Sequence, residues 1–297
     1  MAGEWTDNRG VRFQLKADGT DMLYEAPKHI SGGYIIPNTV TEIGDMAFFD
    51  CSRLTSVIIP DSVTRIGDVA FGNCIGLTEI AVPNSVVELG NMAFSGCGNL
   101  KNVSLPNTIP YIGYFTFYDC KALTSFNIPN SVTVVGDTAF GDCSGLTTIT
   151  IPNSMTVIAR FAFRGCRRLT SIVLPNSVTK IGKGAFYRCS GLTSVTIPDS
   201  VTEIGNGAFR GCFRLTNVTL PSSVKKIGKV SFENVLVRIE KDSPLCPKDF
   251  VPSCFVVRNL HKDGVPAKPK TKKRNITTAI YKDKFLLYFT KYITKIS

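Results

Sequence analysis

The sequence is poor in the residues that most often carry chemistry. Its 297 residues include one tryptophan and two histidines, His29 and His261. It contains no H-E-x-x-H, phosphate-loop or nucleophile-elbow pattern, so it predicts neither a catalytic centre nor a cofactor. No apolar run reaches the ~18 residues of a membrane-spanning helix. The N-terminal stretch MAGEWTDNRGVRF lacks the apolar region of a secretory signal, so we expect a protein that is soluble as written.

What the sequence does contain is a 23-residue repeat. The unit IPNTVTEIGDMAFFDCSRLTSVI begins at Ile36. Seven further full units follow without insertion or deletion, beginning at Ile59, Val82, Leu105, Ile128, Ile151, Leu174 and Ile197. A ninth unit starts at Leu220 but fades after PSSVKKIGKVSF. This periodicity is typical of a solenoid, in which each unit buries its apolar face against its neighbours. Positions within a unit are numbered from 1, the position of Ile36.

Each unit has the same local pattern. LTSVTIP predicts a short strand with Leu, Val and Ile pointing inward, ended by proline. In SVTEIG, Val and Ile point inward, and the chain is expected to turn at the position-9 glycine, which tolerates a positive φ. The following AF pair suits one helical or 3₁₀ turn that drives the phenylalanine into the core. The sequence therefore predicts an α/β repeat solenoid, with a parallel β-sheet on one face and turns or short helices on the other.

The consensus C-x-x-L-x-x-I-x-I-P-x-x-V-x-x-I-G-x-x-A-F resembles the BspA-like (Treponema pallidum-type) leucine-rich repeats, over residues 36–236. The resemblance implies a curved leucine-rich-repeat stack with its parallel sheet on the concave face and turns or short helices on the convex face. It also implies a non-catalytic module for adhesion and recognition of host or partner molecules, with a protein or glycan as ligand. The family location is the cell surface or extracellular space. Because no secretory signal is visible, the cytoplasm is the alternative.

We expect four segments along the chain. Residues 1–35 contain VRFQL, KADGTD and MLYEA, a pattern typical of a hairpin, here capping the first coil. Residues 36–236 hold the solenoid of eight full repeats and a partial ninth, and residues 237–258 are expected to cap its other end. Residues 259–297 begin with HKDGVPAKPKTKKRN, which is typical of an unstructured basic linker and tail.

Eight of the ten cysteines share position 16 of successive units. They are Cys51, Cys74, Cys97, Cys120, Cys143, Cys166, Cys189 and Cys212. Because neighbouring coils stack about 4.8 Å apart, we expect a row of thiols that does not converge on a tetrahedral metal site. The row is predicted to be buried, with each thiol a weak donor to a turn carbonyl. Cys246 and Cys254 lie outside the row, and the sequence leaves open whether they form a disulfide.

Alternation along each predicted strand places positions 21 and 23 on the outward face of the sheet. This strand face is small, rich in hydroxyl groups and nearly uncharged. Its candidate ligand-binding residues are Ser125, Asn127, Thr148, Thr150, Ser171, Ser194 and Thr196. The face is either a ladder of strand-favouring residues or a site for an extended peptide or a glycan.

Charge is distributed unevenly along a chain whose net charge is +11. Residues 36–127 carry four basic and eight acidic side chains, whereas residues 128–236 carry twelve basic and five acidic side chains. The basic half includes IARFAFRGCRRLTSIV, in which Ala159 replaces the usual glycine. Its candidate anion-binding residues occupy turn positions 10, 14, 17 and 18 and are Arg160, Arg164, Arg167, Arg168, Lys183, Arg210 and Arg214. They form either a solvated surface or a site for an acidic protein, sulfated glycan, phospholipid or nucleic acid.

Two functional hypotheses follow. The first is a non-catalytic module that binds a protein or glycan ligand, without a small-molecule substrate, a metal or a cofactor. The alternative is an intracellular scaffold tethered to an anionic membrane or nucleic acid by the basic tail, since residues 255–297 carry eleven basic and two acidic side chains.

Overall fold

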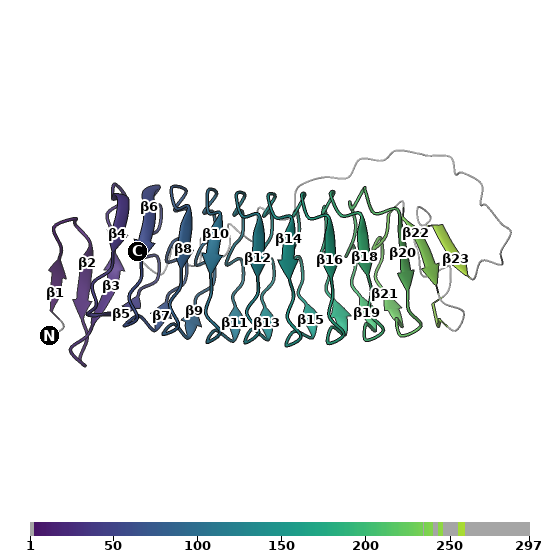
Figure 1. The fold of residues 1–297 in the computed structure, drawn as a ribbon, viewed down its shortest axis with the longest axis horizontal. Coiled ribbons are helices and arrows are strands. Elements are labelled where there is room, and N and C mark those ends of the chain that lie inside the picture. The colour runs from purple at the N-terminus through teal and green to yellow at the C-terminus, as the bar shows by residue number, and fades with distance from the viewer. Residues whose placement is uncertain (1–2, 234, 240–242, 246–254, 259–297) are drawn as a thin grey trace. The chain divides into compact units, whose positions relative to one another are not determined.

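The computed structural model describes residues 3–233, 235–239, 243–245 and 255–258. Within this part of the chain the repeats form a β-solenoid of about nine turns of stacked parallel strands, the leucine-rich-repeat fold (Figure 1). Each full coil contributes two strands, one to each of two sides of the stack. Cys246 and Cys254, whose pairing the sequence leaves open, and the predicted tail at 259–297 lie outside the described residues, as does part of the predicted cap at 237–258.

The longer strands form the strand face. They are β4 (Ser31–Ile35), β6 (Arg53–Ile58), β8 (Glu79–Ala81), β10 (Asn102–Ser104), β12 (Ser125–Asn127), β14 (Thr148–Thr150), β16 (Ser171–Val173), β18 (Ser194–Thr196), β20 (Asn217–Leu220), β22 (Leu236–Ile239) and β23 (Phe255–Arg258). The pairs β8–β10, β12–β14 and β16–β18 are parallel with a register of one repeat, as in Ser171↔Ser194 and Ile172↔Val195. This matches the prediction for LTSVTIP, because the central residue of these strands points inward.

A second ladder of shorter strands, which the sequence did not predict, covers positions 7 and 8 of each unit. Its members are β5 (Val40–Ile43), β7 (Arg65–Ile66), β9 (Glu88–Leu89), β11 (Tyr111–Ile112), β13 (Val134–Val135), β15 (Val157–Ile158), β17 (Lys180–Ile181), β19 (Glu203–Ile204) and β21 (Lys226–Ile227). At the N-terminal end, β3 (Asp21–Glu25) pairs in parallel with β5 and antiparallel with β2 (Arg12–Leu15), which in turn pairs antiparallel with β1 (Glu4–Thr6). Position 8 of each unit points into the core from this ladder.

The core consists of rows of identical side chains that run along the stack. Position 13 supplies nine phenylalanines, from Phe48 to Phe232, that are at most 1% exposed. Neighbouring rings in this row are stacked, with centroids 5.1 to 5.7 Å apart. Each ring therefore covers its neighbours, which explains why a single unit cannot form a core while a stack can.

The turn side differs from the sequence prediction, because the described residues contain no helix. The segment around the AF pair consists of turns in which alternate peptide groups bond to the next coil. The N–H of Phe48 donates to the carbonyl of Ala70 at 2.7 Å, and that of Phe71 to Ala93 at 2.8 Å. The expected helical or 3₁₀ turn is therefore wrong. The concave and convex curvature implied by the family resemblance stays a prediction.

The position-9 glycines also differ from the prediction, because none of them has a positive φ. The left-handed residues are at positions 11 and 15, and they include Val69 at φ 59°. Position 9 favours glycine for a steric reason, with Ala159 as the exception. A Cβ on Gly67 would stand 2.6 Å from the backbone nitrogen of Asp45, and one on Gly90 would stand 2.5 Å from that of Asp68. Adjacent coils therefore approach backbone to backbone at this row.

Candidate functional site

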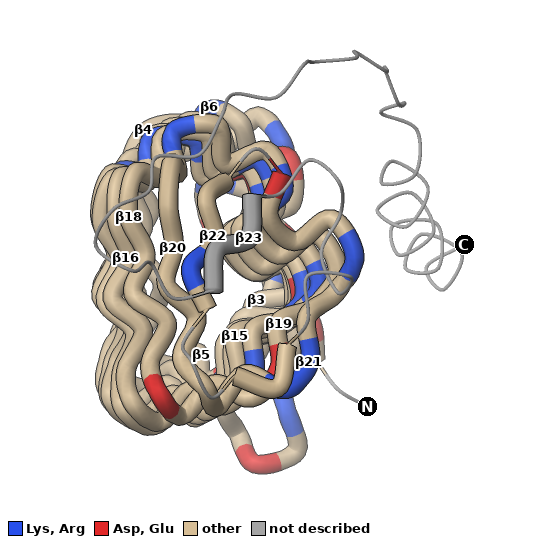
Figure 2. Tube along the Cα trace, turned by 90° about the vertical axis from the view of Figure 1, so that its right-hand side faces the viewer, with Lys and Arg blue, Asp and Glu red and all other residues tan. Residues whose placement is uncertain are grey.

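The structure places the seven predicted basic residues on the turn segments and not on the strand face. Figure 2 looks along the stack and shows a tan edge at β16, β18 and β20, with blue segments around the turns and beside β19 and β21. Arg160, Arg167, Arg168, Lys183 and Arg214 are exposed, whereas Arg164 and Arg210 are half-buried.

Three of the seven are held by carboxylates of neighbouring coils. Arg160 Nε lies 2.8 Å from Asp137 Oδ2. Arg164 is 3.7 Å from Asp142, and Arg210 is 3.4 Å from Glu233. These carboxylates offset part of the positive charge. For the other four residues the described part of the chain supplies no ion pair.

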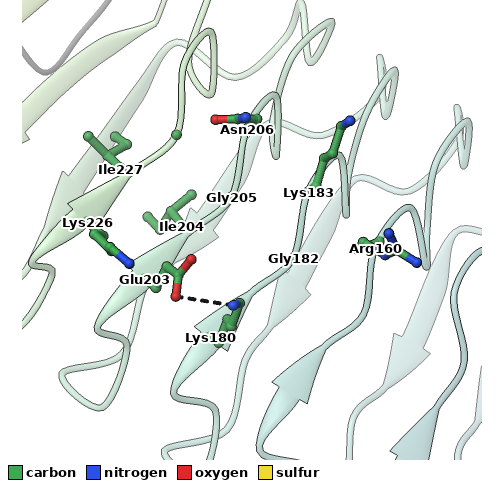
Figure 3. Close-up of a pocket in the computed structure, with 11 residues that line it drawn as sticks. Arg160, Lys180, Gly182, Lys183, Glu203, Ile204, Gly205, Asn206, Lys226 and Ile227 are labelled. Atoms are coloured by element: carbon green, nitrogen blue, oxygen red, sulfur yellow. Dashed lines mark ion pairs between the residues drawn. The ribbon is translucent and has the colours of Figure 1, made fainter.

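The seven residues do not form one patch. Arg160 and Lys183 line an open groove of about 420 Å³ over the short strands β17, β19 and β21, together with Lys180, Glu203 and Lys226 (Figure 3). The Lys180 ammonium pairs with the Glu203 carboxylate at 3.2 Å. The remaining five arginines lie at positions 14, 17 and 18 and do not line this groove.

Two residues beside these arginines had not been selected from the sequence. Phe213 is 75% exposed and directly precedes Arg214. Arg188 lies 5.2 Å from the ring centroid of Tyr187, a cation–π geometry, and its N–H donates to the carbonyl of Arg210 in the next coil. The sequence held a signal for Phe213, because position 17 is serine or glycine in most other units and points to solvent.

The strand face keeps the seven residues predicted for it in exposed positions. The parallel pairing of β12 with β14 places two pairs of them opposite one another, since Ser125 opposes Thr148 and Asn127 opposes Thr150. The exposed apolar residue Val173 opposes Thr196 in the next pair of strands. Its composition is typical of a β-ladder, and from β8 to β20 its outward positions hold none of the aromatic and arginine side chains that dominate protein interfaces.

The cysteine row has the predicted structural role. All eight thiols are buried and free. Cys97 donates to the carbonyl of Phe71 at 3.1 Å, and Cys189 to that of Phe163 at 3.0 Å. Burial raises the pKa of Cys97 and of Cys212 to about 12. These thiols are therefore protonated near neutral pH and are poor nucleophiles.

Two further observations concern only the described residues. They contain no cluster of three or more His, Cys, Asp or Glu side chains suited to a metal ion. They also contain no helix long and apolar enough to cross a membrane.

Comparison with known proteins agrees with this architecture. The family description "BspA type leucine rich repeat region" matches residues 32–147 and 135–241, with six copies. A leucine-rich cell surface protein of Faecalibacterium prausnitzii is 24% identical, with 88% of this chain and 96% of that chain covered and a TM-score of 0.47. The T. pallidum leucine-rich repeat protein is 25% identical, with 77% and 88% covered and a TM-score of 0.45.

The pneumococcal vaccine antigen PcpA is 16% identical, with 91% of this chain and 92% of that chain covered and a TM-score of 0.55. This last likeness shows a shared fold. No curated protein matches the sequence.

Proposed function

The chain belongs to the BspA-type leucine-rich repeat family, and from this premise we propose that it is a non-catalytic protein-binding module. Its role is adhesion or partner recognition at a cell surface, and its ligand is an acidic protein. The observation that carries the proposal is the exposed Phe213 among the arginines of the basic half.

The turn surface of residues 187–214 has the composition of a binding site. Phe213 exposes an aromatic ring to solvent beside Arg214, which is exposed and without an ion pair among the described residues. Aromatic and arginine side chains contribute most of the binding energy in protein interfaces. Arginine also pairs with carboxylates through two parallel hydrogen bonds, which favours an acidic partner.

The equivalent turn surface of the N-terminal half carries carboxylates in place of arginines. There a groove of about 490 Å³ is lined by Asp50, Ser52, Asn73, Ile75, Gly96 and Asp119. Ile75 occupies the same repeat position as Phe213 and is also exposed, at 50%. It therefore provides a matched control for the loss of an exposed apolar side chain from this fold.

The test is binding of the full-length chain to a panel of purified extracellular proteins with acidic and basic isoelectric points. We expect saturable binding to acidic members and a loss of about tenfold or more in affinity for the double variant Phe213→Ala/Arg214→Ala. The Ile75→Ala control should stay within about twofold of the wild type. Binding that prefers basic members, or that falls equally in both variants, would contradict the proposal.

A further inference from the structure

Position 10 of the repeat forms a hydrogen-bonded ladder in the N-terminal half. The peptide N–H of Asp68 donates to Asp45 Oδ1 at 2.8 Å, and that of Asn91 donates to Asp68 Oδ1 at 2.6 Å. The N–H of Tyr114 then donates to Asn91 Oδ1 at 2.9 Å. Each Asp or Asn at this position therefore caps the peptide group of the next coil with its side-chain oxygen.

The ladder is interrupted once at Tyr114 and then over two successive coils of the basic half, where Arg160 and Lys183 occupy position 10 and have no acceptor atom in their side chains. The peptide groups that follow them in the stack are those of Lys183 and Asn206. Among the described residues, neither of these two N–H groups has a hydrogen-bond acceptor. The side-chain cap resumes one coil later, where Lys229 N–H donates to Asn206 Oδ1 at 2.8 Å.

Lys183 and Asn206 both line the groove over β17, β19 and β21. A Cβ on Gly205 would stand 2.5 Å from the nitrogen of Lys183, and one on Gly228 would stand 2.2 Å from the nitrogen of Asn206. Glycine at these two positions lets the backbone of the next coil pack close to each nitrogen. Figure 3 shows the glycine row between the side chains of Lys183 and Asn206 and those of Lys180, Glu203 and Lys226.

The side chains around the two peptide groups add positive charge and further donors. Lys183 and Lys226 are exposed, and neither has an ion pair among the described residues. Asn206 lines the groove and uses its Oδ1 to accept from the Lys229 N–H, which leaves its Nδ2 as a further donor. The one carboxylate that lines the groove, Glu203, is held by Lys180.

We propose that this groove is a binding site for the carboxylate of an Asp or Glu side chain in an acidic peptide. A carboxylate accepts a hydrogen bond from the N–H of Lys183 or of Asn206, as Asp45 and Asp68 each accept one within the acidic half. Lys183 and Lys226 then supply charge-assisted contacts. The site is separate from the Phe213 surface, and it stands whether or not that surface binds a partner.

The first test is an amide NMR titration of the full chain with the blocked peptide Ac-Gly-Asp-Asp-Gly-NH₂. The N–H protons of Lys183 and Asn206 should move downfield and saturate. Those of Asp68 and Asn91 should not move, because they already have internal acceptors. The Asn-Asn peptide should have no effect. The second arm of the experiment uses sulfate at equal ionic strength. A response to sulfate but not to the Asp peptide would overturn the carboxylate assignment. The absence of any response would overturn it as well.

The second test separates the peptide groups from the general positive charge, using Lys183→Asn and Lys183→Gln. Both changes remove one charge, but only asparagine has the length that caps the next coil in this fold, as Asn91 and Asn206 do. We expect Lys183→Asn to weaken binding of the Asp peptide by about tenfold and Lys183→Gln by about threefold. Lys183→Asn should also move the Asn206 N–H downfield without ligand, which verifies the cap. Equal losses in the two variants would show that charge alone attracts the peptide.

Discussion

The two halves of the solenoid present opposite charge at the same repeat positions. At position 7, Arg65 stands between Glu42 and Glu88 in adjacent strands and contacts both. Six coils further along, Glu203 stands between Lys180 and Lys226 in the same register. Position 10 changes in the same direction, from Asp45 and Asp68 in one half to Arg160 and Lys183 in the other.

Beneath these surfaces the two halves are the same. The rings of Phe71 and Phe94 are 5.4 Å apart and those of Phe163 and Phe186 are 5.6 Å apart, in both cases nearly parallel. The cysteines donate to the same carbonyl of the unit before them in both halves. The comparison teaches that stacking determines the fold, whereas the outward positions are free to carry recognition. The shared core and the differing outward positions can each be tested by substitution.

The largest effect is expected from the shared core. Phe94→Ala and Phe186→Ala each remove a ring that is covered on both sides, and each should lower the free energy of unfolding by about 3–5 kcal/mol. The measurement is urea denaturation of the full chain, followed by circular dichroism. The two values should agree within experimental error. A clearly smaller loss in one half would mean that the halves differ in their cores as well.

The next effect is a pH dependence that both halves should share. Burial raises the folded-state pKa of Cys97 and Cys212 to about 12, above an ordinary value of 9. The thiols therefore ionise first in the unfolded chain, so their contribution is fully present below pH 9 and is lost as pH rises toward 12.

The measurement is the slope of unfolding free energy against pH in this window. Cys97→Val and Cys212→Val should each reduce the slope by about one proton, or ~1.4 kcal/mol per pH unit. An unchanged slope in either variant would indicate a thiol that ionises as readily folded as unfolded.

The smallest stability effect is expected from the inverted triads. Arg65→Ala leaves Glu42 and Glu88 facing one another, and Glu203→Ala does the same for Lys180 and Lys226. Each should lower the free energy of unfolding by about 1 kcal/mol or less, since these groups are partly exposed. Their effects on ligand binding should differ. Glu203→Ala should strengthen binding of the Asp peptide about twofold, whereas Arg65→Ala should leave it unchanged. Equal effects of the two variants would remove the distinction between the halves.

Much of the fold was predictable because it depends on features that repeat in the sequence. The phenylalanine and cysteine rows follow directly from a 23-residue period, as does the outward direction of Thr148 and Thr150. The helical turn was wrong because the AF segment satisfies its peptide groups in the next coil. The glycine turn was wrong because Gly67 is needed for close stacking, while the positive φ belongs to Val69, an ordinary residue that gives no signal.

The groove was only partly predictable. Arg160 and Lys183 were selected for their charge, which is visible in the sequence. The sequence did not show that these two side chains leave the peptide groups of Lys183 and Asn206 without a hydrogen-bond cap. That outcome depends on which atoms of adjacent coils lie within hydrogen-bond distance. Reading position 10 down the repeats, from Asp45 and Asp68 to Arg160 and Lys183, would have shown where acceptors are replaced by cations.

The most direct test of the central claim is hydrogen–deuterium exchange of the full chain with and without poly-L-aspartate. The claim is that recognition of acidic ligands resides in the basic half of a uniformly built solenoid. Exchange should slow in peptides that cover residues 182–214 and stay unchanged in peptides that cover the equivalent turns at 45–91. Slowed exchange at 45–91, or in neither region, would contradict the account.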